Sequence, residues 1–99
     1  MIHLDEKKSE KYQIKQKHLK DAARLKRLLR QGVVEFTYKK LDGSLRKARG
    51  TLKPSLLPET DENDDRRRQK PGYCTYFDLG VSDWRMFKTE NMRDIREND

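Results

Sequence analysis

Residues 33–52, VVEFTYKKLDGSLRKARGTL, decide the fold of this chain. Within 34–39, apolar side chains alternate with polar ones, which is typical of a strand that is buried on one face. The Asp42-Gly43 step that follows tolerates the positive φ angles of a tight turn. Residues 44–52 are then expected to return as a second strand, in which Gly50 marks a bulge or a close approach of the backbone. The stretch therefore predicts a β-hairpin.

Further strands are predicted after the hairpin. Residues 73–79, YCTYFDL, are rich in β-forming residues and predict a third strand. A turn at 80–83 leads into a fourth strand at 84–88, WRMFK. Residues 89–95 are expected to end the domain as a short strand or a helical turn.

Two segments are expected to lie outside the packed domain. Residues 59–72 hold an acidic block followed by a basic block with no apolar residue, so they predict a mobile charged loop. Residues 96–99 are polar and predict a disordered tail.

The N-terminal third predicts one basic helix. Residues 7–30 contain no Gly or Pro and consist mostly of good helix formers. Gly32 follows the last basic turn, where the helix is expected to end. Six apolar residues recur at spacings near three and four and form an apolar stripe: Leu19, Ala22, Ala23, Leu25, Leu28 and Leu29.

The order of the elements predicts the fold class. One helix followed by four or five short strands, with no second crossover helix, argues against a parallel sheet. Short antiparallel strands protect their edges by curling into a small barrel. We therefore predict a mainly β protein with an N-terminal α-helix. Residues 1–32 form the basic helix, and residues 33–95 form a small SH3-like or Sm-like five-stranded antiparallel barrel.

The positive charge is concentrated in the helix. Of the net charge of +7, residues 1–31 carry +6, because they hold ten Lys and Arg but only four acidic residues. Such an asymmetry is typical of a surface that binds nucleic acid, although a solvated helix that keeps a small protein soluble has the same composition. The helix residues expected to contact phosphates are Lys15, Lys20, Arg24 and Arg27.

Composition argues against several classes of protein. Cys74 is the only cysteine, so no internal disulfide forms, and no paired Cys/His spacing predicts a metal site. No cofactor is expected. The chain has no run of eighteen apolar residues and no secretory leader, so we expect no membrane segment and a cytoplasmic protein, in a bacterial cell or an infected host cell.

No arrangement of residues predicts catalysis. His3 and His18 have no orienting partner in the sequence, and Cys74 lies on a predicted strand without a nearby histidine. A pocket that unites Cys74 with His18 is the enzymatic alternative. We expect a binding module and no enzyme.

The aromatic and basic residues of the strands are candidates for ligand binding. Arg46 and Arg49 are three residues apart on the second strand, so alternation places them on opposite faces. Arg85 follows Trp84, and a guanidinium beside an aromatic plane is a pairing that holds bases or acidic groups. The alternative is that Trp84 or Phe87 simply packs in the core.

Four motifs follow one another in the order found in a known bacterial domain. They are VEFTY at 34–38 with DGS at 42–44, Arg46 with the later PSLL at 54–57, YFDL at 76–79, and WRMFKTENM at 84–92. The last is similar to a terminal pattern Arg-x-Phe-Arg-x-x-Arg-Ile. Residues 33–95 thus resemble the WYL domain of bacterial transcriptional regulators, and they are more similar still to short stand-alone WYL-like proteins of bacteria and their mobile elements.

The resemblance implies a Sm/SH3-like barrel that binds nucleic acid or a nucleotide-like ligand, in a regulator of phage or mobile-element origin. It adds Tyr76 and Lys88 to the candidate ligand residues. The chain departs from the family pattern because Lys88 and Asn91 stand where the pattern has arginines, and the Trp-Tyr-Leu triplet is not intact. One helix also cannot supply the winged helix-turn-helix of full regulators.

Two classes of partner are open. Nucleic acid bound through the lysines and arginines of the helix gives weakly specific, salt-dependent binding. Alternatively, the chain is a protein-interaction adaptor or inhibitor. In that case the apolar stripe of the helix docks on a protein partner or on a second copy in a homodimer, or the barrel edge adds a strand from a partner. The first hypothesis needs the basic residues and the second needs the leucines.

Overall fold

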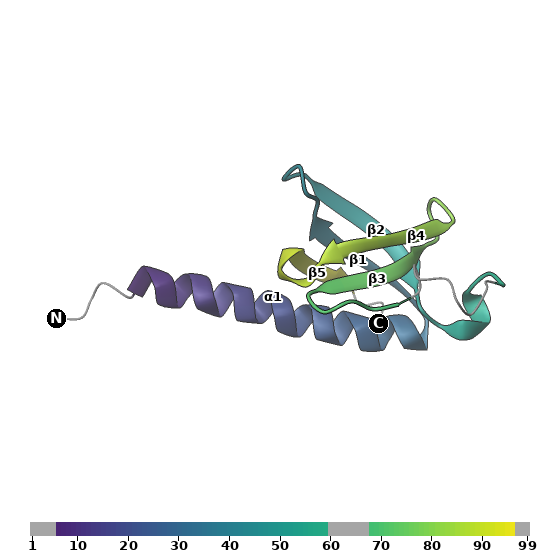
Figure 1. Ribbon diagram of the computed structural model, residues 1–99, viewed down its shortest axis with the longest axis horizontal. Helices are drawn as coiled ribbons and strands as arrows, with labels where there is room; N and C mark the ends of the chain where they lie inside the picture. The colour runs from purple at the N-terminus through teal and green to yellow at the C-terminus, as the bar shows by residue number, and fades with distance from the viewer. Residues whose placement is uncertain (1–5, 60–67, 97–99) are drawn as a thin grey trace.

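The structure, a computed structural model, describes residues 6–59 and 68–96, with side chains from residue 13 onward. Within these described residues, one long helix precedes five strands and two short 3₁₀ helices (Figure 1). The elements are α1 (Glu6–Gln31), β1 (Val33–Lys39), β2 (Leu45–Thr51), η1 (Pro54–Leu56), β3 (Tyr73–Asp78), β4 (Asp83–Lys88), η3 (Thr89–Asn91) and β5 (Met92–Arg96).

The five strands form one antiparallel sheet in the order β4-β3-β2-β1-β5. The predicted mainly β fold with an N-terminal helix is therefore confirmed. Strands β4 and β5 are the two edges and do not pair with each other in the described part of the chain, so the curled sheet stays open between them. Residues 89–95 were expected to form either a short strand or a helical turn. The segment contains both, namely η3 and β5.

The β1–β2 hairpin forms where the Asp-Gly step predicts it. The strands pair without interruption from Val33↔Thr51 to Lys39↔Leu45. Gly43 adopts a φ of 89°, and the carboxylate of Asp42 accepts hydrogen bonds from the backbone N–H of Ser44 at 2.9 Å and from its hydroxyl at 2.6 Å. These bonds hold the turn closed.

Gly50 marks a close approach of the backbone, and the uninterrupted pairing of β1 with β2 excludes a bulge there. A Cβ atom at this position would lie 2.5 Å from Cδ2 of Tyr76 and 3.0 Å from the carbonyl oxygen of Phe77. Strands β2 and β3 pair only at Gly50↔Asp78 and Thr51↔Phe77, so the sheet turns sharply at this point.

The buried face of α1 forms one hydrophobic core with the barrel. Ala22, Leu25 and Leu29 are at most 1% exposed. The residues that they join in this core are Phe36, Tyr38, Ala48, Cys74, Tyr76, Phe87 and Met92. Burial of apolar surface at this interface supplies the main driving force for attaching the helix.

Hydrogen bonds to β2 hold the end of α1. The last carbonyl groups of a helix have no partner within the helix itself. Here the hydroxyl of Thr51 donates to the carbonyl of Gly32 at 2.8 Å and to that of Leu29 at 3.3 Å, and the backbone N–H of Leu52 donates to Leu29 at 2.8 Å. Gly32 does not adopt a positive φ, so the side chain of Thr51 satisfies carbonyls at this helix end without a left-handed glycine.

The apolar stripe of the helix is narrower than the sequence predicts. Ala23 is exposed, and Leu19 and Leu28 are only half-buried. Because Leu25 and Leu29 are completely covered by the barrel of the same chain, these two residues of the stripe have no exposed surface for docking on a partner. Ile14 is 56% exposed. The N-terminal part of α1 extends beyond the barrel (Figure 1). Within the described residues, no helix is apolar enough over a sufficient length to cross a membrane.

The charged segment at 59–72 is described only at its ends, since residues 60–67 lie outside the described residues. At its C-terminal end, the side-chain amide of Gln69 donates to the carbonyl of Thr75 at 2.7 Å and accepts from its N–H at 2.9 Å. Of the tail predicted at 96–99, Arg96 belongs to β5, which corrects that boundary, and residues 97–99 lie outside the described part.

The packing of α1 predicts a large effect of truncating Leu29. Leu29→Ala is expected to lower the free energy of unfolding by about 2–5 kcal/mol, because a fully buried leucine leaves a cavity. Leu41→Ala is the matched control, because Leu41 is 88% exposed and the expected change is within about 0.5 kcal/mol. Urea denaturation measures both, and equal effects would contradict the described packing.

Candidate functional site

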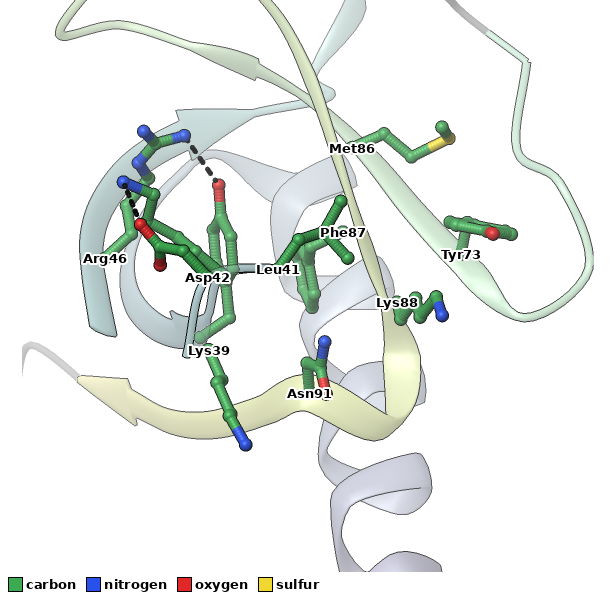
Figure 2. Close-up of a pocket in the computed structure, with 11 residues that line it drawn as sticks. Lys39, Leu41, Asp42, Arg46, Tyr73, Met86, Phe87, Lys88 and Asn91 are labelled. Carbon is green, nitrogen blue, oxygen red and sulfur yellow. Dashed lines mark hydrogen bonds and ion pairs between the residues drawn. The ribbon is translucent and has the colours of Figure 1, made fainter. Parts of the chain in front are cut away.

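A pocket opens at the mouth of the barrel, between the tip of the β1–β2 hairpin and the β4–η3 corner (Figure 2). Its volume of about 410 Å³ lies within the range of small-molecule sites. We call it the mouth pocket. Its lining residues are Tyr38, Lys39, Lys40, Leu41, Asp42, Arg46, Tyr73, Met86, Phe87, Lys88 and Asn91.

The mouth pocket is electropositive. Four of its lining residues carry a positive charge, namely Lys39, Lys40, Arg46 and Lys88, and Asp42 carries the single negative charge. Nζ of Lys40 lies 3.8 Å from the carboxylate of Asp42, so that carboxylate is already partly neutralised. Hydrogen bonds from the hydroxyl and backbone of Ser44 keep the pKa of Asp42 below its usual value. The net positive field favours an anionic ligand.

Aromatic and apolar side chains supply the rest of the lining. The rings of Tyr38 and Phe87 stack at 4.2 Å between centroids with an interplanar angle of 9°, and both residues are buried. Met86 and Tyr73 lie together on one side, and Leu41 lies on the hairpin side (Figure 2). Leu41 and Met86 are exposed, so an apolar part of a ligand can contact them.

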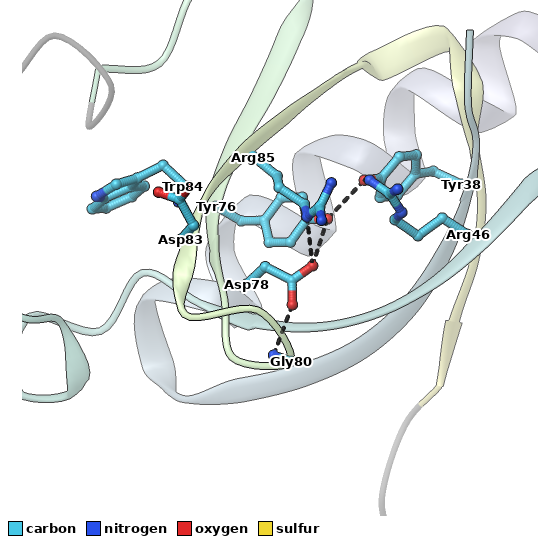
Figure 3. Close-up of polar contacts among 8 residues, drawn as sticks. All are labelled: Tyr38, Arg46, Tyr76, Asp78, Gly80, Asp83, Trp84 and Arg85. Carbon is cyan, nitrogen blue, oxygen red and sulfur yellow. Dashed lines mark hydrogen bonds and ion pairs between the residues drawn. The ribbon is translucent and has the colours of Figure 1, made fainter. Parts of the chain in front are cut away.

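A chain of polar contacts inside the barrel positions Arg46 (Figure 3). Nη1 of Arg46 donates to the hydroxyl of Tyr38 at 3.4 Å, and the hydroxyls of Tyr38 and Tyr76 are 2.7 Å apart. The hydroxyl of Tyr76 donates to Oδ2 of Asp78 at 3.4 Å. The hydrogen bond to Tyr38 raises the pKa of Arg46, and burial raises that of Tyr76. The guanidinium therefore stays charged while the phenol stays neutral.

The same chain ends at Arg85, on the inner face of β4. Nε of Arg85 lies 3.2 Å from Oδ2 of Asp78, which makes an ion pair whose N–H is not aligned for a hydrogen bond. Oδ1 of Asp78 accepts the backbone N–H of Gly80 at 2.8 Å. Asp78 is only 6% exposed, so these partners compensate a buried charge.

The structure brings together some of the residues that the sequence singled out. Arg46 and Lys88 both line the mouth pocket. Tyr76 is completely buried beneath it and reaches Arg46 only through Tyr38. Its role in direct ligand contact is therefore a wrong prediction, since its hydroxyl contacts Tyr38 and Asp78 in the interior.

Trp84 and Arg85 do not form one site. They are neighbours in β4 and thus point to opposite faces of the sheet, as Figure 3 shows. Arg85 pairs with Asp78 inside, whereas the ring of Trp84 packs edge-on against Phe77 at 5.5 Å. The expectation of a guanidinium beside the Trp84 plane is therefore wrong, and Phe87 is the aromatic residue of this strand in the central core.

Arg49 lies outside the mouth pocket. It is exposed and lines a second hollow, which contains a comparable number of acidic and basic side chains. The charged residues of this hollow are Glu35, Lys47, Arg49, Asp78, Asp94 and Arg96. The predicted placement of Arg46 and Arg49 on opposite faces is confirmed, but this hollow has no excess of positive charge to select an anion.

The structure places the predicted basic residues of the helix on two faces of α1. Lys20, Arg24 and Arg27 are exposed on α1, but Nζ of Lys15 lies 3.6 Å from the carboxylate of Glu90 in η3, on the side of the barrel. Lys17, which was not among the predicted residues, is exposed and continues the line of Lys20, Arg24 and Arg27 at helical spacing. We call Lys17, Lys20, Arg24 and Arg27 the helix ridge.

Most of the mouth pocket was also missed. Tyr38, Lys39, Lys40 and Tyr73 are far from Lys88 in sequence and meet it only through the order of the strands. A signal was present in the hairpin, since Lys39 and Lys40 directly precede the predicted turn and Arg46 closely follows it.

Cys74 and the histidines do not form a catalytic arrangement in the described structure. Cys74 is buried, and burial raises the pKa of its thiol to about 12. Nδ1 of His18 lies 3.1 Å from the carbonyl oxygen of Glu90 and 3.1 Å from Nη1 of Arg93, and His3 lies outside the described residues. Among the residues described, no cluster of three His, Cys, Asp or Glu offers a metal site.

Comparison with protein families relates the chain to a known family. The family model described as WYL_2, with an Sm-like SH3 beta-barrel fold, matches residues 22–93. The match begins at Ala22, the first residue of the buried helix face, and includes the whole sheet up to Arg93. Neither the curated proteins nor the solved structures contain a match to the chain.

The burial of Cys74 predicts slow thiol chemistry. In the folded protein at mildly alkaline pH, Ellman's reagent is expected to react on the order of a hundredfold more slowly than with the urea-unfolded chain. The reason is that the raised pKa leaves little thiolate and the side chain is covered. Absorbance of the released thiolate measures the rate, and equal rates in both states would rule out a buried thiol.

Proposed function

The chain belongs to the WYL_2 family, a family with an Sm-like SH3 barrel, and we propose that this small binding module takes up an anionic nucleotide-like ligand in its mouth pocket. The ligand is a free nucleotide or one unit of a nucleic-acid strand. The observation that carries the proposal is the combination of four cationic side chains with one carboxylate around apolar and aromatic walls.

The cationic side chains suit a phosphate group. Arg46 is held by Tyr38, so its guanidinium loses less conformational freedom when it binds an anion. Lys39 and Lys88 approach the same pocket from β1 and β4. Charge-assisted hydrogen bonds from such groups to phosphate oxygens are among the stronger polar contacts.

The apolar side of the pocket suits a base. Tyr73 and Met86 lie on the side of β4 away from Arg46 in Figure 2, and Met86 is 46% exposed. Stacking on an aromatic or apolar side chain depends little on which base is bound. A ligand with a flat ring and a phosphate would therefore satisfy both halves of the pocket.

A biological role can be proposed together with the ligand. A small barrel that binds a nucleotide-like ligand can act as a regulator, which is the role that the resemblance to bacterial regulators implies. We propose that the protein is such a regulator, that it is of phage or mobile-element origin, and that it binds its ligand in the mouth pocket.

A protein-docking function is the second candidate, and one observation favours it. A groove of about 480 Å³ runs between η1 and the β3–β4 hairpin, next to the edge strand β4. Leu56 is 46% exposed there, and Phe77 and Trp84 complete the apolar wall. An extended segment of a partner protein, or of a second copy, could add to this edge.

The proposed function predicts a loss of affinity when the pocket is neutralised. Arg46→Gln/Lys88→Gln is expected to weaken binding of a fluorescent single-stranded oligothymidylate by at least about 100-fold, because each charged hydrogen bond contributes about 1.5–3 kcal/mol. Fluorescence anisotropy at constant low salt measures the affinity.

The matched control is Lys47→Gln/Arg49→Gln, which removes the same charge from exposed positions of β2. Its affinity is expected to change only a few-fold. If both double variants lose the same affinity, the mouth pocket is not the binding site.

A further inference from the structure

The solvent-facing side of α1 is a second basic surface. The residues of the helix ridge follow one another at spacings of three, four and three residues, so they lie along one line of the helix. All four are exposed. None of the exposed helix residues between Gln13 and Gln31 is acidic, and Asp21, the one acid in this stretch, is half-buried.

The ridge is held in place by the opposite face of the same helix. Ala22, Leu25 and Leu29 fix α1 to the barrel, and Leu29 is bonded to β2 through its carbonyl. The ridge is thus built on a helix whose position is set before any ligand binds. At a rise of about 1.5 Å per residue, it extends for about 15 Å from Lys17 to Arg27.

The composition of the ridge narrows the class of partner. Ala23 is the only exposed apolar residue between Lys17 and Arg27. Protein interfaces depend on buried aromatic and large apolar residues at their centre, which are absent here among the described side chains. A helix that inserts into a lipid surface needs an apolar face, and the apolar face of α1 is covered by the barrel. Binding to a phosphate backbone needs only regularly spaced positive charge.

We propose that the helix ridge binds the phosphate backbone of duplex nucleic acid, as a site separate from the mouth pocket. A length of about 15 Å covers about four phosphates of one strand, since these are spaced about 3.4 Å along the duplex axis. The four cations of the ridge thus match the phosphates that they can reach. Lys17 and Lys20 precede the region that matches the family, so half of the ridge lies outside it.

The charge of the ridge sets the expected salt dependence. For four phosphates neutralised, the logarithm of the affinity falls with a slope of about −3.6 against the logarithm of the salt concentration. Between about 50 and 200 mM salt this slope corresponds to a loss of affinity of about 150-fold. The probe is a fluorescent duplex DNA of mixed sequence, about 20 base pairs long, titrated with the full chain and followed by anisotropy.

The decisive variant is K17Q/K20Q/R24Q/R27Q. Glutamine has nearly the helix propensity of lysine and arginine, so circular dichroism and thermal unfolding are expected to match the wild type. Its affinity for the duplex is expected to fall at least about 100-fold at low salt, and its salt slope to approach zero. If this variant does not fold, K17Q, K20Q and R27Q are tested singly, and each is expected to reduce the slope by about 0.9.

The matched control removes the same charge elsewhere. K47Q/R49Q/K53Q/K70Q changes four exposed residues of the barrel side and is expected to retain affinity within a few-fold. Equal losses in both fourfold variants would show a net-charge effect and overturn the proposal, as would an unchanged affinity of the ridge variant.

The two sites are distinguished by their ligands. The pocket variant R46Q/K88Q is expected to keep duplex binding, and the ridge variant is expected to keep oligothymidylate binding. Loss of duplex binding only in the pocket variant would overturn the proposal that the helix ridge binds the duplex. Vesicles rich in phosphatidylserine and polyglutamate serve as competitors, and equally strong competition by either one would assign the ridge to a membrane or an acidic protein and overturn the duplex proposal.

Discussion

The contact between the buried face of α1 and the barrel is the interaction on which the rest of the structure depends. Leu25 and Leu29 are completely buried, and the carbonyl of Leu29 accepts hydrogen bonds from Thr51 and Leu52. Because the apolar residues of the helix are used in this contact, the helix presents a basic side to solvent. The same contact forms the core beneath Tyr38 and Phe87, on which the mouth pocket rests. One packing interface therefore determines where both positively charged surfaces lie.

A layer of polar groups crosses the interior of the barrel and orients Arg46 at the mouth pocket. Tyr38 and Tyr76 place two hydroxyls among aromatic rings, and Asp78 places a carboxylate nearby. Each group has a partner, so the cost of burying it is compensated. The chain of contacts ends at Arg46 on one side and Arg85 on the other. The guanidinium of Arg46 is thereby oriented at the edge of a pocket, whereas the side chain of an exposed surface arginine has no such contact to orient it.

The sequence predicted the elements because their signals are local. The Asp42-Gly43 turn and the alternation before it predict the hairpin, and the absence of Gly and Pro from residues 7–30 predicts the helix. The sites were predicted less well because they depend on contacts between distant residues. Lys15 was chosen over Lys17, although it lies seven residues before the buried Ala22 and therefore on the barrel side of α1, beside Glu90. This local signal was overlooked. The mouth pocket requires β1 and β4 to face each other across an open sheet, and no local pattern reports the order of the strands.

We expect the helix–barrel contact to present two basic surfaces that bind different ligands. Backbone amide NMR shifts of the full-length protein test this most directly, in titrations with a single-stranded oligothymidylate and, separately, with a duplex. The single strand is expected to shift amides at 39–46 and 86–91, whereas the duplex is expected to shift amides of α1 between Lys17 and Arg27. Shifts at one common surface for both ligands, or shifts at neither of these segments, would contradict this expectation.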